Sequence, residues 1–293
     1  MGGIGVLCFS FTLPATRLAD SLLGGTFVGL GRALAAALLA MCVLFIRHES
    51  PPDRRHWRGL VIVAFGVVVG FPLFSSLALQ SLPASHGAVV TGLLPAATAV
   101  MAVLRAGERP SKMFWISCIA GALAVLLFAV SQGAGHFQPG DMLLFVAVLL
   151  GGLGYAEGGR LAREMRGWRV ICWALVIAAP FLVFPVIFSF HPHGNIAQPA
   201  AWFGFAYVSV VSSFLGFFAW YRGLALGGVA RIGQIQLLQP VLTLFWAALL
   251  LHEHVTLLTV LASLLVIASA AVSQWTHKPR TSQEIPSHES SRL

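Results

Sequence analysis

Charge is the scarcest property of this 293-residue sequence. Lys, Arg, Asp and Glu make up 10% of it and hydrophobic residues 58%, whereas soluble domains carry roughly 25% charged residues. So little polar material cannot cover a core in water when apolar runs of about 20 residues recur along the chain. The composition excludes a water-soluble globular domain and favours a protein that lies in a lipid bilayer.

Paired cysteines and enzyme signatures are also missing. The four cysteines, Cys8, Cys42, Cys118 and Cys172, lie inside apolar runs without paired spacing, so we expect neither a disulfide framework nor a metal site, and no cofactor. The segment His252–His254 is not an H-E-x-x-H motif, and no G-x-S-x-G elbow or paired-aspartate motif occurs. An intramembrane enzyme is therefore disfavoured.

The net charge of +8 does not indicate a nucleic-acid partner. The basic residues lie between apolar runs rather than in one cluster. The first apolar run lacks the basic leader and exit site of a cleavable signal peptide, so we interpret it as a retained helix. It begins almost at Met1, which leaves open an upstream start codon.

Ten apolar runs could cross a membrane. Backbone groups in lipid must be satisfied within their own segment, so runs of this length predict helices rather than barrel strands. The predicted spans are 2–18, 24–46, 57–80, 84–104, 113–131, 141–160, 168–190, 199–221, 228–250 and 256–275.

Lys and Arg gather on one side of this arrangement. Ten spans place both termini and the loops after spans 2, 4, 6 and 8 on the same side, which holds sixteen of the 18 basic residues. The opposite loops 132–140 and 191–198 carry none. This asymmetry predicts cytoplasmic termini in a bacterial-type inner membrane. The basic residues concerned are Arg47, Arg54, Arg55, Arg58, Arg105, Arg109, Lys112, Arg160, Arg163, Arg166, Arg169, Arg222, Arg231, Lys278, Arg280 and Arg292.

An internal repeat has an offset of 145 residues. It aligns Pro95 with Pro240 and Glu108 with Glu253 without a gap. Five helices per copy force the second copy to enter the membrane from the opposite face, so the repeats are inverted. We therefore predict an all-α membrane protein with five-helix repeats at 1–132 and 139–276 and a disordered cytoplasmic tail at 277–293.

Inverted repeats allow two near-equivalent packings that open to opposite sides, as alternating access requires. The alternative is that duplication merely produced a stable bundle. A channel is a further alternative, although it favours a polar lining along the whole pore.

The motifs at equivalent positions resemble those of EamA-type carriers of the drug/metabolite transporter superfamily. The second half reads WYRGLAL from Trp220, LLQP to Pro240 and LLLHE to Glu253, and the first half repeats this as LALQ to Gln80, LLP to Pro95 and GE to Glu108. The resemblance implies a 5+5 inverted fold whose central cavity is lined mainly by helices 1, 3, 4, 6, 8 and 9. It also implies export of a small metabolite, with an amino acid or related compound favoured.

Spans 4 and 9 each carry a polar stripe at helical spacing. Thr91, Pro95 and Thr98 share one face, and Gln236, Pro240 and Thr243 repeat it. Such stripes face either a cavity or another helix. We favour the cavity for Gln236, leave the threonines open between the two, and interpret the prolines as hinges rather than as ligand contacts.

Five further positions are candidates for substrate binding. The repeat pairs Ser10 with Tyr155, and Glu157 offers a carboxylate that could bind an amino group, couple transport to protons or simply pair with Arg160. Arg32 inside span 2 suits a carboxylate substrate or, preferably, a structural partner such as Asp20. Trp220 is either a cavity residue or an interfacial aromatic.

The expected partners are therefore a small-molecule substrate and lipid, with a proton as a candidate coupling ion. Monomer and homodimer both stay open, since Gly25-x-x-x-Gly29 and Gly66-x-x-x-Gly70 could pack within or between subunits.

Overall fold

The computed structural model describes residues 1–106, 111–132, 138–192 and 196–276, without side-chain placement at a few helical positions within those ranges. The predicted loop position Glu108 and the predicted tail 277–293 lie outside the described residues. The described part contains fourteen α-helices and two π-helical segments, and it has no strand. They are α1 (Gly2–Ser10), α2 (Thr12–Leu23), α3 (Gly25–Ile46), α4 (Arg54–Val63), η1 (Ala64–Gly70), α5 (Phe71–Leu79), α6 (Ala84–Thr91), α7 (Leu94–Ala106), α8 (Lys112–Gln132), α9 (Pro139–Glu164), α10 (Gly167–Ser189), α11 (Pro199–Ala206), η2 (Tyr207–Leu215), α12 (Gly216–Gln236), α13 (Gln239–Leu251) and α14 (Leu257–Thr276).

Seven helical stretches of the described chain are long and apolar enough to cross a membrane. Their apolar side chains point outward as well as inward, as expected of helices in contact with lipid. The all-α membrane class is thus confirmed. The seven stretches are Gly2–Leu23, Gly25–Ile46, Arg54–Leu79, Ala84–Leu104, Pro139–Glu164, Gly167–Ser189 and Pro199–Gly227, and three shorter apolar helices cover Lys112–Phe128, Gln239–Leu251 and Leu257–Val272.

Two predicted boundaries are wrong. The first stretch extends to Leu23 rather than to residue 18, with a turn at Phe11 between α1 and α2. The predicted loop between spans 8 and 9 is helical, because α12 continues from Gly216 to Gln236. In the first half, Pro83 lies between the corresponding helices α5 and α6. Proline lacks an amide hydrogen and favours a break, and the second half has no proline at the equivalent position.

Element boundaries recur at the offset of the sequence repeat. Helices α7 and α8 begin at residues 94 and 112, and α13 and α14 begin 145 residues later, at 239 and 257. The π-helical segments end at residues 70 and 215, which are also 145 apart. The same backbone irregularities have therefore formed twice from two related stretches of sequence.

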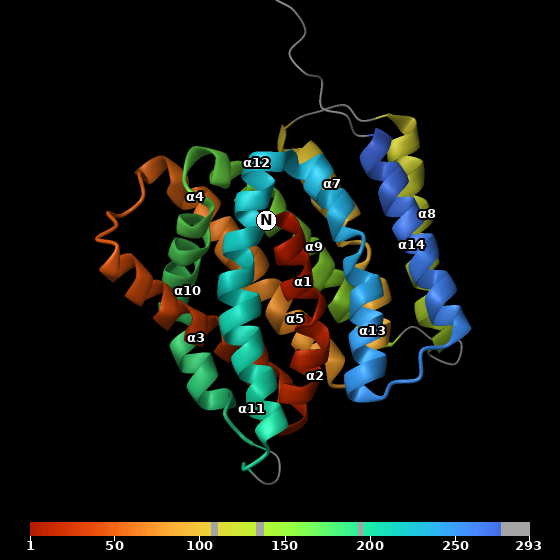
Figure 1. The fold of residues 1–293 in the computed structure, drawn as a ribbon, viewed down its shortest axis with the longest axis horizontal. Helices are drawn as coiled ribbons and strands as arrows, with labels where there is room; N and C mark the ends of the chain where they lie inside the picture. Colours follow the sequence, from red (N-terminus) through yellow and green to blue (C-terminus); the bar gives the residue numbers. More distant parts are fainter. Residues whose placement is uncertain (107–110, 133–137, 193–195, 277–293) are drawn as a thin grey trace, which may run out of the picture.

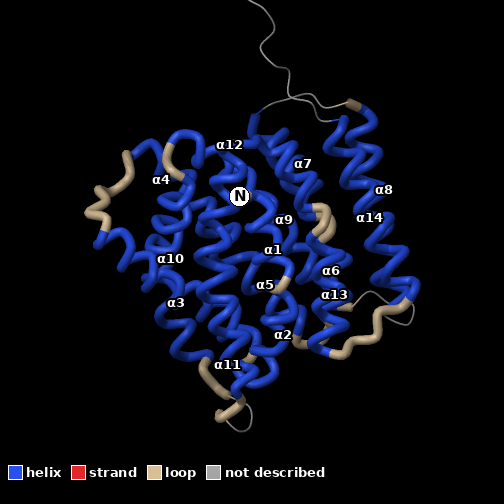
Figure 2. Tube along the Cα trace, viewed as in Figure 1, coloured by secondary structure: helices blue, strands red, loops and turns tan. Residues whose placement is uncertain are grey.

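The helices assemble into one bundle in which sequence-distant elements lie side by side (Figure 1). Helix α3 packs along α10, α1 packs along α12, and the pair α8 and α14 forms one flank. Helices α1, α2, α5, α9 and α12 meet in the interior. Figure 2 shows the longer tan connections at the ends of the bundle and short tan breaks within it. Elements of both halves thus enclose the centre.

Both small-residue motifs are used within the chain. A Cβ atom on Gly29 would lie 2.7 Å from the Cα of Leu73 in α5, and one on Gly66 would lie 2.6 Å from the carbonyl oxygen of Leu150 in α9. These glycines let helix backbones touch inside one subunit.

Candidate functional site

A small cavity lies in the interior where the two halves meet. The centre of a water-sized sphere can reach about 20 Å³ of it, and a water molecule needs roughly 10–15 Å³ by this measure. The cavity is therefore large enough for a water molecule but too small for a metabolite in this conformation. Its lining is Phe9, Thr12, Leu13, Arg32, Val67, Phe71, Pro72, Thr91, Tyr155, Ser212, Phe217 and Gln239.

Arg32 of α3 is the charged residue of this lining. Its side chain is 2% exposed, and one edge of its guanidinium group donates to two hydroxyls of η2, from Nε to Ser213 at 2.8 Å and from Nη2 to Ser212 at 2.7 Å. Nη1 has no hydrogen-bond partner within the described chain. The serines thus fix the orientation of a guanidinium group that keeps donor capacity free at the cavity.

The π-helical geometry of η2 explains how neighbouring serines reach the same arginine. A π-helical turn accommodates an extra residue and is often found at functional sites. The hydroxyl of Ser212 also lies 2.8 Å from that of Thr12 in α2, which joins three elements around Arg32. Equivalent positions of the first half are Val67 and Val68, so this polar side of the cavity belongs to one repeat only.

Aromatic rings form the apolar part of the cavity wall. The ring centroids of Phe9 and Phe217 are 5.0 Å apart, and Tyr155 lies 6.2 Å from Phe9 with nearly parallel planes. Trp220 adds to this cluster behind Tyr155, at 5.3 Å. These rings can pack against a flat apolar body.

Asp20 and Arg17 of α2 place further charges close to Arg32. One oxygen of Asp20 accepts a hydrogen bond from Ser76 at 3.2 Å, and the other has no hydrogen-bond partner in the described ranges. Asp20 interacts electrostatically with both arginines, yet no ion pair within 4 Å joins these described residues. Arg17 donates to the carbonyl oxygen of Leu79.

The structure brings three of the predicted binding residues, Arg32, Thr91 and Tyr155, to the cavity. The Thr91 hydroxyl donates back to Gly87 of its own helix at 2.8 Å. The preferred pairing of Arg32 with Asp20 is replaced by the bonds to Ser212 and Ser213.

Ser10 and Thr243 lie together next to the cavity rather than in its lining. The Thr243 hydroxyl donates to the Ser10 carbonyl at 2.8 Å, and the indole of Trp246 donates to the Ser10 hydroxyl at 3.1 Å. These bonds hold α13 against the turn between α1 and α2.

Three other predicted residues are buried outside the lining. Thr98 donates to the carbonyl of Leu94 in its own helix. Gln236 is 2% exposed and Trp220 is 1% exposed, and neither the Gln236 Nε2 nor the Trp220 Nε1 has a hydrogen-bond partner among the described residues. Their roles in binding stay predictions.

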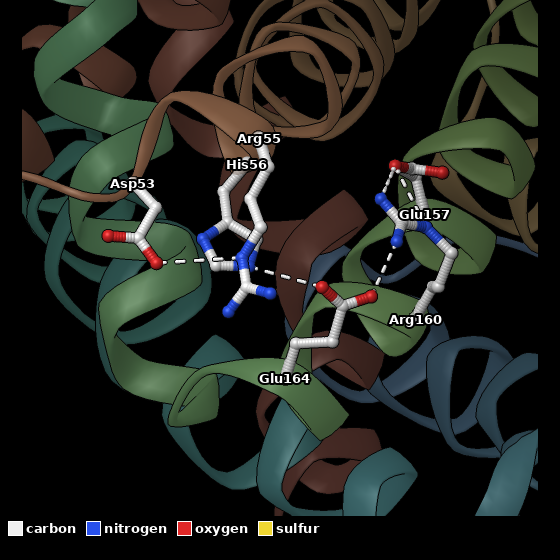
Figure 3. Close-up of polar contacts among 6 residues, drawn as sticks. All are labelled: Asp53, Arg55, His56, Glu157, Arg160 and Glu164. Atoms are coloured by element: carbon white, nitrogen blue, oxygen red, sulfur yellow. Dashed lines mark hydrogen bonds and ion pairs between the residues drawn. The ribbon is translucent and has the colours of Figure 1, made fainter.

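Glu157 lies towards the arginine-rich end of the bundle, in the network drawn in Figure 3. Its Oε1 accepts from the Arg160 Nη2 at 2.7 Å, Arg160 also pairs with Glu164 at 2.6 Å, and Glu164 lies 3.1 Å from the Nε2 of His56 in α4. The network ties the end of α9 to the start of α4.

A second set of polar contacts joins the halves at the opposite end of α9. His86 of α6 lies 2.6 Å from Asp141, with both side chains almost fully buried. Glu253, in the connection after α13, accepts hydrogen bonds from the backbone amides of Ala84 and Ser85 at 2.8 Å each. Asp141 and Glu164 lie about 35 Å apart along the helix, so polar contacts join α9 to neighbouring helices at both ends of the bundle.

Comparison with known proteins assigns this architecture. The model of the EamA-like transporter family matches residues 1–130 and 138–274. The chain belongs to the EamA-like transporter family. It is 47% identical over 275 residues to the uncharacterized transporter YdeK of Bacillus subtilis, covering 93% of this chain and 95% of that protein.

More distant proteins agree with this assignment. Protein PecM of Dickeya dadantii is 24% identical over 232 residues, covering 75% of the EamA-like chain and 74% of PecM. A crystal structure with 16% identity superposes with a TM-score of 0.64, over 93% of this chain and 94% of that one, and shows the same fold. The chain is thus a membrane transporter of the drug/metabolite transporter type, and its family and its relative YdeK carry transporter names rather than enzyme names.

The prolines of this EamA-like chain stand at helix starts. Pro95 and Pro240 occupy the second positions of α7 and α13, directly after the breaks at residues 92–93 and 237–238. Proline fits there because an amide at a helix start needs no partner within the helix. The hinge role stays a prediction, now located at these two breaks.

Sequence reasoning missed several residues of the EamA-like site. Ser212, Ser213 and Gln239 were not predicted as binding residues, although all lie close to Arg32 or in the cavity lining. A detectable signal was present, because Ser209, Ser212 and Ser213 share one helical face of an otherwise apolar span. No cluster of His, Cys, Asp or Glu suited to a metal occurs in the part of the chain that the structure describes.

Proposed function

We propose that this chain is a secondary carrier that moves a small metabolite by alternating access, through the central cavity between two inverted five-helix halves, residues 1–132 and 139–276. The resemblance supports outward transport of an amino acid or related compound. The distribution of Lys and Arg supports cytoplasmic termini in a bacterial-type inner membrane.

One observation carries the proposal: a cavity with polar and aromatic walls is lined by residues from both halves of the chain. Arg32, Thr91 and Phe71 come from the first half, and Tyr155 and Gln239 come from the second. A site at the junction of two repeats becomes accessible to either side when the repeats move relative to each other.

The repeat in element boundaries supports the inverted relation. An odd number of helices in each copy inserts the second copy with opposite polarity, so a backbone arrangement that opens one end has a counterpart that opens the other. The two matches to the family model, at 1–130 and 138–274, coincide with the two halves.

Counterflow in proteoliposomes tests the proposal. Vesicles that contain the carrier and are loaded with unlabelled solute should accumulate labelled solute transiently against its concentration gradient, because exchange is faster than net movement. The solutes should represent amino acids, organic acids, amines and neutral metabolites, and each should be tested with and without a proton gradient to identify the coupling.

Flux that neither saturates nor shows counterflow would indicate a channel instead. Absence of movement for every solute class in vesicles that contain folded protein would contradict a transport function.

A further inference from the structure

The cavity wall carries one cationic group with free donor capacity and has no anionic group of its own. Arg32 uses Nε and Nη2 for the serine hydroxyls, whereas Nη1 is buried without a partner in the described ranges. Of the described residues in the lining, none is Asp or Glu. A buried guanidinium group with an unused edge is costly unless something accepts from it.

The nearby charges do not cancel that of Arg32. Arg17 and Arg32 contribute two formal positive charges and Asp20 at most one negative charge, so Asp20 cannot neutralise both arginines. The two other buried carboxylates among the described residues already have partners, Glu157 in Arg160 and Asp141 in His86. A bound anion would balance the remaining charge, since opposite charges attract strongly where water is scarce.

The other residues of the lining indicate the chemistry of the rest of the ligand. The Oε1 of Gln239, which is 8% exposed, is buried without a partner among the described residues and can accept from a neutral hydroxyl or N–H group. Phe9, Phe71, Phe217 and Tyr155 supply apolar ring surface around it. A free ammonium group on the ligand would find no carboxylate among the described residues of the lining, so the loss of its hydration would be unfavourable.

From these contacts we infer that the substrate is a carboxylic acid with a flat apolar body and no free ammonium group. Its carboxylate accepts from Arg32, a neutral donor faces Gln239, and the body lies against the aromatic side of the cavity. This inference rests on the proposed carrier function, and it replaces the amino acid that the resemblance favours with a related carboxylic acid that lacks the ammonium group.

Three probes of matched size test the inference. L-3-Phenyllactate and L-phenylalanine differ in a hydroxyl in place of an ammonium group, and 3-phenylpropanamide lacks both the acid and the ammonium group. Their affinities for the purified full-length protein are measured by calorimetry and their fluxes in proteoliposomes. We expect phenyllactate to bind at least about tenfold more tightly than either of the others, the loss typical of an unmatched buried polar group.

Variants test whether Arg32 causes the preference for the acid. Arg32→Gln should weaken phenyllactate binding at least about tenfold and remove the preference over the amide, and Arg32→Lys should retain the preference for an acid at lower affinity. The control Arg58→Gln removes the same charge from an exposed residue of α4 outside the lining and should leave the preference unchanged. The wild-type probe series remains decisive if Arg32→Gln fails to fold.

Two outcomes would overturn the inference and separate it from the carrier function. If phenylalanine or the amide binds as tightly as phenyllactate, or if vesicles carry another solute class while phenyllactate neither binds nor moves, the substrate class is wrong and the carrier function stands. If no solute of any class moves, the carrier function fails as well.

Discussion

Arg32 depends on hydroxyls from another helix for its orientation. A guanidinium group that loses one of these acceptors must leave a charged donor unsatisfied inside the protein, because the adjoining side chains of α3 and η1 are apolar. The serines of η2 therefore matter to stability as well as to the site.

Ser212→Ala tests this dependence. We expect a loss of about 1–3 kcal/mol in the free energy of unfolding, because Arg32 Nη2 and the Thr12 hydroxyl both lose a partner. Thermal unfolding in detergent provides the measurement. Ser209→Ala is the control, because the Ser209 hydroxyl bonds only to Phe205 of its own segment among the described residues, and equal stability of the two variants would contradict the account.

At the residue scale, the sequence predicted the candidate arginine but not its partners. Arg32 is conspicuous because a cation within an apolar span requires an acceptor. Asp20 was the preferred acceptor because opposite charges attract, yet the π-helical geometry of η2 brings two hydroxyls closer. An irregular turn of this kind depends on tertiary packing and has no reliable signature in a single sequence.

Glycine residues determine how closely neighbouring helices approach one another. Gly66 of η1 lies against Leu150 and Gly154 of α9, at the crossing that supports the cavity wall formed by Val67 and Tyr155. Added side-chain volume at such a crossing must move a backbone, since the nearest atom is a carbonyl oxygen.

Gly66→Ala should therefore destabilise the protein by about 1–3 kcal/mol. Gly3→Ala is the matched control, because a Cβ atom there meets nothing within 4 Å. Both variants can be compared by thermal unfolding and by recovery after size-exclusion chromatography. A Gly66→Ala protein as stable as the control would show that α9 and η1 separate without cost.

The breaks before α7 and α13 are expected to act as hinges. Pro95→Ala and Pro240→Ala restore an amide that could continue the preceding helix, so we expect transport to slow by about tenfold or more with substrate affinity nearly unchanged. Transport rate and affinity are measured separately. Pro180→Ala, which removes an exposed proline inside α10, is the control and should leave the rate unchanged.

The all-helical class was well predicted, because long apolar runs leave few alternatives in lipid. Helix boundaries were predicted less well where the residue types permit either a helix or a loop. Helix α12 continues through the predicted loop around Arg222, since glycine and arginine tolerate helix and no proline interrupts them.

Orientation is a property of the whole molecule. A fusion placed after residue 276 should make green fluorescent protein fluoresce and leave alkaline phosphatase inactive, because the arginine-rich side predicts a cytoplasmic C-terminus. Fusions in the connection between α10 and α11 should give the reverse result. Phosphatase activity at the C-terminus would contradict the predicted orientation.

Alternating access requires that two halves related by an inverted repeat open the cavity to one side at a time. The repeat supplies an unusual control, because a pair of positions at one end has a counterpart 145 residues away at the other. Ser21 and Ala200 flank the contact of α2 with α11, and their counterparts Arg166 and Arg55 flank the contact of α9 with α4. All four are exposed.

Pulsed electron paramagnetic resonance with spin labels on each pair, in proteoliposomes with and without transported solute, is the most direct test. Alternating access predicts that the distance between positions 21 and 200 increases in the state in which the distance between positions 55 and 166 decreases, and the reverse. Distances that stay fixed, or that increase together at both ends, would contradict it.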